Sequence, residues 1–377
     1  MRMKKISIYT RDTQTASSSY YRIWQYFNRL GEKYTIYDRS FVPAFLTRLQ
    51  YNYSNETGVT GFATKISYHF FVYVNSIRYF LTDILFTKPE VVVVLRSITP
   101  KTFFNPARFL YRALLNKTDS VLWDFDDDIF VNNEISKGER RLLEEKVNHI
   151  IVTHDYLAQL VGESYRSKIV IMPTTEGDFT LYDSEALITQ RAKTYNDIRM
   201  VWLASSAGLR DIESISAELD EAASILEQQF NKRLKLVIVC NKCPILNVQK
   251  LVVEYHEWSR EIAKQELLRA HFGIMPLIDN KFSQGKGGFK IIQYMSSGLP
   301  QIASAVGFNR QVISDNESGF LVEESNKQNG WITSILKLST NKDTWYRMSR
   351  NAYARWGSNF SFYQNLDTWV HLIEGGD

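Results

Sequence analysis

Apolar residues are spaced along this chain in two ways that alternate from end to end. Short continuous apolar runs, such as the valines at 91–94, are typical of strands buried in a parallel sheet, whereas apolar positions three or four residues apart indicate helices. The predicted strands cover residues 5–9, 90–95, 120–123, 148–152, 168–172, 199–204, 234–239 and 272–276, and another ends at 254–258. The predicted helices cover residues 22–30, 261–270, 331–338, 344–356 and 360–374, and two more lie around 156–161 and 291–295. This alternation predicts an α/β fold.

The length of 377 residues suits two domains of similar size. Residues 182–197 are interpreted as a linker and hinge. We therefore predict a first domain over residues 1–190 and a second over residues 198–356. The final segment, 357–377, is amphipathic.

Residues 41–86 are unusually rich in aromatic side chains. On a helix, Phe70, Val74, Ile77, Leu81 and Ile84 share one face, and we favour the interpretation that this face packs on the first sheet. A second interpretation stays open, because basic residues such as Lys65 and Arg78 lie nearby in sequence. The same aromatic face could then lie against a membrane that carries a lipid-linked acceptor.

The net charge of +4 is mild and does not indicate a nucleic-acid partner. Cys240 and Cys243 are the only cysteines, so a disulfide framework is excluded and reduced thiols are expected. No secretory signal is recognised at the N-terminus, and residues 70–86 are interrupted by polar side chains. We therefore expect a cytoplasmic protein, at most peripheral to the inner face of the plasma membrane.

Four acidic positions follow the strand at 120–123, in the run Asp124-Phe-Asp126-Asp127-Asp128. Open α/β sheets bind ligands at the carboxyl ends of their strands, so at least one of these carboxylates is expected to be functional. Asp126 and Asp127 are the candidate catalytic residues, and capping of the next segment is the alternative. Asp124 and Asp126 also satisfy a short metal-binding pattern, but no metal is expected.

A glycine loop at 285–288 leads into the helix around 291–295. Gly287 and Gly288 let the backbone approach a ligand closely, and a helix N-terminus attracts anions. Lys286 and Lys290 add two cations within about one helical turn. The loop therefore predicts a diphosphate site.

Residues 289–309, with the pattern helix, Gly-x-Pro, strand and Val-Gly-x-Asn, resemble the C-terminal signature of family 4-type retaining glycosyltransferases, also called group 1 glycosyltransferases. The resemblance implies a GT-B fold, in which two Rossmann-like domains face each other across a cleft and the last helix packs back on the first domain. The family usually carries two glutamates eight positions apart, where this chain has Gly285 and Gln293. Gln293 can still hydrogen-bond a ribose hydroxyl.

The resemblance also implies roles for single residues. Ser205 stands where the family has a phosphate-binding arginine, and Arg210 stands where it has a lysine. Asp126 takes the position of a histidine near the reacting sugar carbon. Arg22, after the first strand, is a candidate contact to the sugar or the acceptor, and capping by the preceding serines is the alternative.

Together these features predict a glycosyltransferase of hexosyltransferase type, with a nucleotide-sugar as co-substrate, a glycan or lipid-linked acceptor and no further cofactor. Retention, independence from metal and a role in bacterial surface polysaccharide or glycolipid synthesis are implied by the resemblance. The missing glutamates at 285 and 293 leave an alternative, an inert glycosyltransferase-like module that binds a nucleotide or a glycan.

Overall fold

The computed structural model describes residues 2–14, 16–53, 59–99, 106–131 and 134–375. The chain divides into two compact units, of which the first comprises Met1–Thr174 and Tyr363–Asp377 and the second comprises Thr175–Phe362. Each unit contains one six-stranded sheet whose neighbouring strands all pair in parallel. The prediction of an α/β fold with two Rossmann-like domains is confirmed.

The sheet of the first unit has the strand order β2-β1-β3-β4-β5-β6. Its strands are β1 (Lys5–Thr10), β2 (Thr35–Ser40), β3 (Val91–Leu95), β4 (Ser120–Phe125), β5 (His149–Val152) and β6 (Ile169–Ile171). Its helices are α1 (Ser17–Ser19), η1 (Tyr20–Trp24), α2 (Gln25–Leu30), α3 (Ala44–Tyr53), α4 (Val59–Thr82), η2 (Asp83–Thr87), α5 (Pro106–Lys117), α6 (Lys137–Lys146), α7 (Asp155–Leu160) and η3 (Glu163–Lys168). Every residue of β3 is buried, as a central parallel strand requires.

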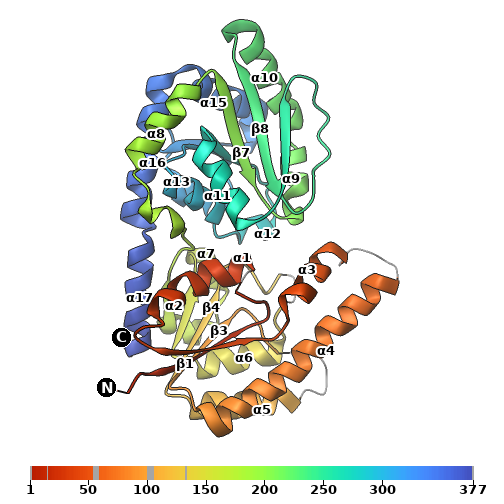
Figure 1. The fold of residues 1–377 in the computed structure, drawn as a ribbon, viewed down its shortest axis with the longest axis vertical. Coiled ribbons are helices and arrows are strands. Elements are labelled where there is room, and N and C mark those ends of the chain that lie inside the picture. Colours follow the sequence, from red (N-terminus) through yellow and green to blue (C-terminus); the bar gives the residue numbers. More distant parts are fainter. Residues whose placement is uncertain (1, 15, 54–58, 100–105, 132–133, 376–377) are drawn as a thin grey trace. The chain divides into compact units, whose positions relative to one another are not determined.

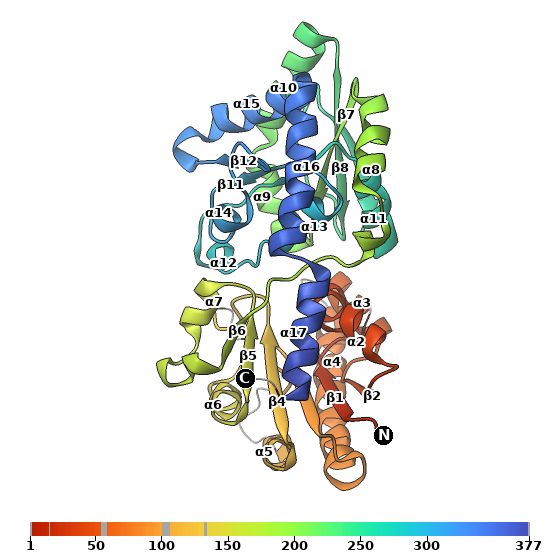
Figure 2. The same ribbon diagram turned by 90° about the vertical axis from the view of Figure 1, so that its left-hand side faces the viewer.

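The last helix, α17 (Phe362–Glu374), lies against α2 within the first unit (Figure 2). The ring of Trp369 meets the ring of Phe27 edge-on, with centroids 5.2 Å apart. Asn365 donates hydrogen bonds to the Tyr26 hydroxyl and to the carbonyl oxygen of Pro173. The end of the chain therefore completes the core that its beginning starts (Figure 1).

The sheet of the second unit has the strand order β12-β11-β10-β7-β8-β9. Its strands are β7 (Asp197–Leu203), β8 (Arg233–Cys240), β9 (Val252–Glu257), β10 (Phe272–Met275), β11 (Gln301–Ser304) and β12 (Gly319–Val322). Its helices are η4 (Asp178–Leu181), α8 (Ser184–Arg191), η5 (Ala192–Thr194), η6 (Ser206–Gly208), α9 (Leu209–Glu213), α10 (Ser216–Phe230), α11 (Arg260–Arg269), α12 (Lys281–Gln284), α13 (Phe289–Ser296), α14 (Asn309–Val312), η7 (Glu324–Asn326), α15 (Lys327–Thr340) and α16 (Lys342–Asn359).

Helix α13 is fixed to this sheet through Tyr294. The Tyr294 hydroxyl donates to the carbonyl oxygen of Ile274 and accepts from the backbone N–H of Leu203. Its ring lies so close to β10 that a Cβ at Gly273 would meet the Tyr294 Cδ2 atom at 2.3 Å. Position 273 therefore requires glycine, and any side chain there would push α13 off the strands that it covers.

The prediction that residues 182–197 form a linker is wrong. Helix α8 and segment η5 belong to the second unit, and Ile188 is fully buried in its core. The guanidinium of Arg191 is buried and donates to the carbonyl oxygens of Leu267, Leu268 and Ser297. These carbonyls lie at the C-terminal ends of α11 and α13, which lack intrahelical donors there. The division between the units lies at Thr174 instead.

The predicted core face of the aromatic-rich segment is correct only in part, since Ile77 and Ile84 pack against the core. Phe70, Val74 and Leu81 are exposed, whereas the buried face of α4 carries Tyr68, Val72 and Phe80. The Phe80 ring stacks on Tyr111 of α5, with ring centroids 5.0 Å apart. Both faces of this helix are apolar, so periodicity alone could not identify the side that packs on the sheet.

Candidate functional site

The first candidate site lies at the carboxyl edge of the second sheet. Strand β7 has β8 as its neighbour on one side and β10 as its neighbour on the other. The direction of the strand order therefore changes between β7 and β10. Ligands of open α/β sheets bind at such a switch point. Ser205 follows β7 and is exposed, and the N–H of Ser206 donates to Asn241 Oδ1, which follows β8, at 2.7 Å. The loops after β7 and β8 are thereby tied together.

Helix α13 begins beside this edge. Gly288 precedes its first residue with φ 63°, a left-handed conformation that favours glycine. A Cβ at Gly288 would also lie 3.2 Å from both Phe308 and Val312. Lys290 is half-buried in the first turn. Burial raises the pKa of the Cys240 thiol, and a backbone hydrogen bond and the charge of Lys290 oppose that rise, which places the ammonium near the end of β8.

Lys286 is held by an acid that we did not predict from the sequence. Its Nζ lies 3.3 Å from Asp211 Oδ2, and the other oxygen of Asp211 accepts from the N–H of Ile278, which follows β10. Arg210, the neighbour of Asp211 on α9, is exposed, and Gly287 is buried. The structure thus brings Lys286 to the loops of Ser205 and Arg210, with part of its charge neutralised.

Gln293 faces a second acid that the sequence analysis missed. Both Gln293 and Glu176 are buried, and Gln293 Nε2 donates to Glu176 Oε2 at 2.9 Å. Glu176 Oε1 accepts from the N–H of Asp178, so the carboxylate is also fixed by its own turn. A carboxylate therefore lies beside the position where glutamate was expected. Its only signal in the sequence was an acid in the turn after Pro173.

The acidic tip of the first sheet lies next to its own switch point, between β1 and β3. Asp126 and Asp127 both bind Arg96, which follows β3: Arg96 Nε donates to Asp126 at 2.9 Å and Nη2 donates to Asp127 at 2.5 Å. Arg96 has φ 57°, which is uncommon for a residue with a side chain. Burial raises the pKa of Asp127, and the charge of Arg96 opposes that rise. Sequence reasoning missed Arg96, because a cation after a strand carries no pattern.

Arg22 does not fit the predicted contact with sugar or acceptor. Its side chain is 1% exposed and forms a two-pronged ion pair with Asp124, which is fully buried. The remaining nitrogen, Nη1, donates to the carbonyl oxygen of Met172 and to Thr174. Arg22 therefore holds the strand ends together. Asp124 is also unsuited to hold a metal with Asp126, since its two oxygens already accept from Arg22.

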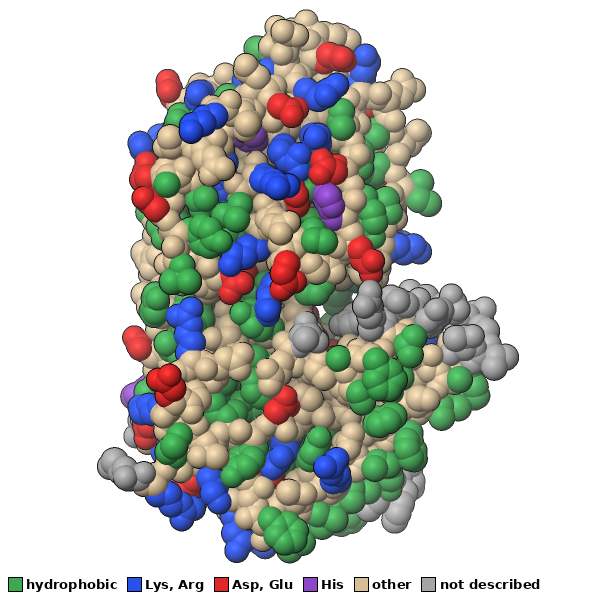
Figure 3. Space-filling view, in the orientation of Figure 1, with side chains coloured by type: hydrophobic (Ala, Val, Ile, Leu, Met, Phe, Trp, Pro, Cys, Tyr) green, Lys and Arg blue, Asp and Glu red, His purple; other side chains and the backbone are tan. Residues whose placement is uncertain are grey.

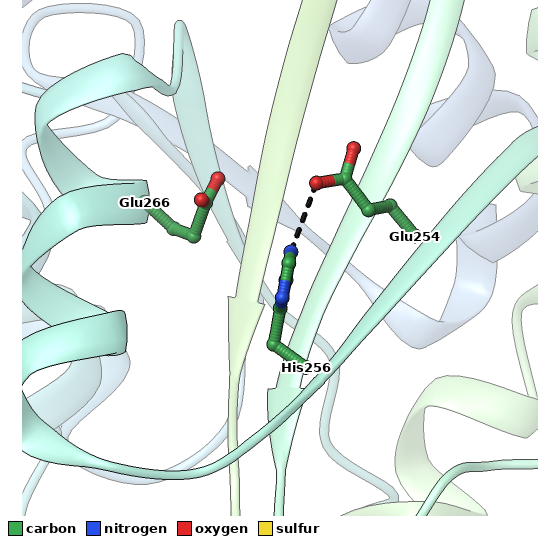
Figure 4. A group of neighbouring side chains, drawn as sticks. All are labelled: Glu254, His256 and Glu266. Atoms are coloured by element: carbon green, nitrogen blue, oxygen red, sulfur yellow. Dashed lines mark hydrogen bonds and ion pairs between the residues drawn. The ribbon is translucent and has the colours of Figure 1, made fainter.

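One cluster on the second sheet has side chains suited to a metal. The ligand atoms of Glu254, His256 and Glu266 lie within 4.8 Å of one another, and His256 Nε2 is 2.9 Å from Glu254 Oε1 (Figure 4). Cations of the protein already occupy the cluster, because Arg199 pairs with both glutamates and Lys235 pairs with Glu254. Burial favours a raised pKa at Glu254, but hydrogen bonds from His256 and Arg199 lower it to about 2. We assign the cluster as an ion-pair network.

Among the described residues, none of the helices combines the length and apolar character that a membrane span needs.

The comparisons with known proteins concern the second unit and the fold. Residues 205–341 match the profile of the family described as Glycosyl transferases group 1. A search of curated protein sequences found no match.

Three solved structures are similar over nearly the whole chain. A glycosyltransferase from Rickettsia africae is 14% identical with a TM-score of 0.62, covering 99% of this chain and 98% of its own. HepE from Anabaena, solved in complex with UDP, is 10% identical with a TM-score of 0.62, and the match covers 99% of this chain and 100% of HepE. Sucrose-phosphate synthase from Thermosynechococcus elongatus is 12% identical with a TM-score of 0.66, covering 99% and 98%. At such low identity, the likeness establishes the fold. The chain therefore has the GT-B glycosyltransferase fold, and its residues 205–341 match the group 1 glycosyltransferases, as the sequence analysis expected.

Proposed function

We propose that this protein is a hexosyltransferase that moves a sugar from a nucleotide-sugar to a glycan or lipid-linked acceptor, with retention of anomeric configuration and without a metal. Its setting would be the cytoplasmic assembly of a bacterial surface polysaccharide or glycolipid. The observation that carries the proposal is the turn into α13, where Gly288 and Lys290 stand at the switch point of the sheet. The HepE structures with UDP and with UDP-glucose support a nucleotide-sugar donor.

The donor diphosphate would lie at the N-terminus of α13. The backbone there carries partial positive charge, and Lys290, Lys286 and Arg210 add cations from three neighbouring positions. Gly287 and Gly288 keep side chains away from the backbone that faces the phosphates, and Ser205 adds a hydroxyl. Fixed cations of this kind stabilise the leaving group in the place of a metal ion.

Gln293 would contact the ribose. Its amide nitrogen faces Glu176, so the carbonyl end of the amide is turned away from that carboxylate. A carbonyl oxygen accepts hydrogen bonds from hydroxyl groups, as the glutamate of the family would.

The sugar transfer would use the acidic tip of the first sheet. The bond between the anomeric carbon and the diphosphate oxygen breaks, and the electron pair leaves with the nucleoside diphosphate. The acceptor oxygen forms the new bond to the anomeric carbon, and its proton passes to the carboxylate of Asp126 or Asp127. Arg96 holds both carboxylates in place at the strand end, so their geometry does not depend on the substrate.

Two measurements test the proposal. A thermal-shift panel of nucleoside diphosphates and their sugars should show one base stabilising the protein selectively. Incubation with the selected nucleotide-sugar should release the nucleoside diphosphate, at the same rate in excess EDTA. A rate abolished by EDTA and restored by Mn²⁺ would contradict the metal-free chemistry.

The alternative function is an inert module that binds a nucleotide or a glycan. Gly285 and Gln293 favour it, because both stand where the family carries glutamate. Selective stabilisation by a nucleotide-sugar without any release of nucleotide, with or without candidate acceptors, would support this module and exclude the transferase.

A further inference from the structure

The first unit exposes an apolar surface that its own core does not use. It runs along α4 and continues onto η2 and α5, and its side chains range in exposure from 39% at Leu81 to 77% at Phe86 and Phe109. We call this surface the apolar stripe. It consists of Phe62, Ile66, Phe70, Val74, Leu81, Leu85, Phe86 and Phe109. Figure 3 shows hydrophobic side chains gathered on the surface over α4.

On α4, the stripe is a continuous face rather than a scatter of single side chains. Phe62, Ile66, Phe70 and Val74 are each four residues apart, so they lie above one another on the helix. Helix α4 has 24 residues and is about 36 Å long. Its opposite side packs through Val72 and Phe80 in the core, which anchors the helix without help from the stripe. Large exposed apolar patches of this kind mark interaction surfaces.

The charges around the stripe are mostly positive. The sequence from 59 to 119 contains eight lysines and arginines against three acids, Asp83, Glu90 and Asp119. Asp83 is buried and pairs with Arg39 and the Tyr9 hydroxyl, so it contributes no negative charge to the surface. The exposed basic residues on or next to these helices are Lys65, Arg78, Lys88, Arg112 and Lys117.

We propose that the apolar stripe and its basic rim bind the surface of an anionic lipid bilayer. Aromatic and aliphatic side chains would enter the boundary between headgroups and acyl chains, and the basic rim would attract the lipid phosphates. The inference deepens the proposed function, since a lipid-linked acceptor is presented at such a surface. It rests on α4, η2 and α5, and does not depend on the donor site.

A second copy of the chain is a less suitable occupant. In a two-fold dimer the same patch meets itself, so the basic rim of one copy would face the basic rim of the other. An anionic bilayer offers both an apolar interior and the opposite charge.

Vesicle co-sedimentation tests the proposal on the full-length protein. Wild type should bind vesicles of phosphatidylglycerol and phosphatidylethanolamine, and bind vesicles of phosphatidylcholine at least about tenfold more weakly. The stripe variant Phe62→Ser/Phe70→Ser/Phe86→Ser and the rim variant Arg78→Glu/Lys117→Glu should each lose about tenfold or more in affinity for the anionic vesicles. The control Leu181→Ser/Ile245→Ser removes two side chains of the second unit that are 83% and 87% exposed, and should bind as wild type does.

Three results would overturn the proposal: no binding by wild type, equal binding by the stripe variant, or a concentration-dependent dimer that the stripe variant abolishes. Release of nucleotide from a nucleotide-sugar in solution separates this proposal from the proposed function. The stripe variant should keep that activity, which also shows that it folds. Loss of vesicle binding with normal release leaves the transferase intact, whereas vesicle binding without any release contradicts the transferase alone.

Discussion

The carboxyl edges of the two sheets differ in the groups that form them. In the first unit, the edge consists of side-chain ion pairs, with Asp124 on Arg22 and both Asp126 and Asp127 on Arg96. In the second unit, the left-handed Gly288 starts α13, and Lys286 forms an ion pair with Asp211. At the first edge, Arg96 is shared by Asp126, Asp127 and Glu134, so the carboxylates outnumber the cations, whereas the second edge has the basic residues Lys286, Lys290 and Arg210. Under the proposed function, the second unit binds the anion and the first supplies the carboxylate chemistry.

The largest effect is expected at the half-buried part of the first edge. Asp126→Asn keeps the shape of the side chain and removes the proton acceptor, so turnover of sugar transfer should fall by about 10²- to 10⁴-fold. Donor affinity should change little, because the donor is expected on the other sheet. Steady-state kinetics and a separate titration of the nucleoside diphosphate measure the two quantities.

Asp128→Asn is the matched control for this prediction. Asp128 accepts hydrogen bonds from the N–H groups of Phe130 and Val131, so it caps its own turn. Its variant should turn over within a few-fold of wild type. Equal turnover by wild type and Asp126→Asn would leave Asp126 a structural partner of Arg96.

The buried part of the first edge should matter for stability instead. Arg22→Met leaves Asp124 charged and unpaired in the interior, which costs about 3 to 5 kcal/mol. The double variant Arg22→Met/Asp124→Leu removes both charges and should recover most of that loss. Chemical denaturation, with hydrogen exchange in β4 as a local probe, measures both.

Arg350→Met provides the comparison with an exposed pair. Arg350 pairs with Glu185 on the surface of the second unit, with both side chains more than half exposed. Solvent screens such a pair, so the denaturation midpoint should not move. If Arg22→Met/Asp124→Leu were as unstable as Arg22→Met, lost packing rather than the unpaired charge of Asp124 would explain the loss of stability in Arg22→Met.

The second unit buries the neutral imidazole of His271, so the stability of the protein should depend on pH. His271 is fully buried, Nδ1 accepts from the N–H of Arg199, and Nε2 lies 3.1 Å from the carbonyl oxygen of Arg191. Burial lowers the pKa of His271 to about 4. Between about pH 6.5, the ordinary pKa of histidine, and about pH 4, the imidazole of His271 binds a proton in the unfolded chain and not in the folded chain.

Stability should therefore fall as the pH falls from about 6.5 to 4, by about 3 kcal/mol from this residue, and level off below. Denaturation of wild type at several pH values measures the slope. In His271→Gln, the amide can accept from Arg199 and donate to Arg191 without titrating, so the difference between the two curves isolates the histidine. Parallel curves would show that His271 is not the group responsible.

Much of the fold could be predicted from the sequence because buried parallel strands are written as apolar runs. The strands predicted at 90–95 and 120–123 are observed as β3 (Val91–Leu95) and β4 (Ser120–Phe125). Strand β2 was missed because it lies at the edge of the sheet, where its residues are half-buried or exposed. Its sequence includes Asp38 and Arg39, so it shows no apolar run. The face of α4 that packs was predicted only in part, because a helix with two apolar faces shows the same periodicity on each.

The site could be predicted only where the backbone encodes it. Glycines at 287 and 288 mark a turn before a helix, and the structure has that turn. The partners of charged side chains have no such signal. Arg22 meets Asp124 across 102 positions and Gln293 meets Glu176 across 117, and these pairings depend on which strands become neighbours. Sequence reasoning therefore identified the acidic tip and missed Arg96, which pairs with Asp126, Asp127 and Glu134.

The smallest of these effects is expected at the second edge, at Lys290. The sequence predicted a phosphate contact for this residue, and a binding measurement tests it. Lys290→Ala removes one cation from the first turn of α13 and leaves Gly288 and the helix in place. A hydrogen bond to a charged phosphate contributes about 1.5 to 3 kcal/mol, so the nucleoside diphosphate and the nucleotide-sugar should each bind about 10- to 100-fold more weakly. Isothermal titration measures both affinities. Lys281→Ala, an exposed lysine of α12, is the control and should bind as wild type does. Unchanged diphosphate affinity in Lys290→Ala would mean that the backbone turn alone holds the anion, and the contrast between the two edges would then be one of backbone against side chain rather than of charge.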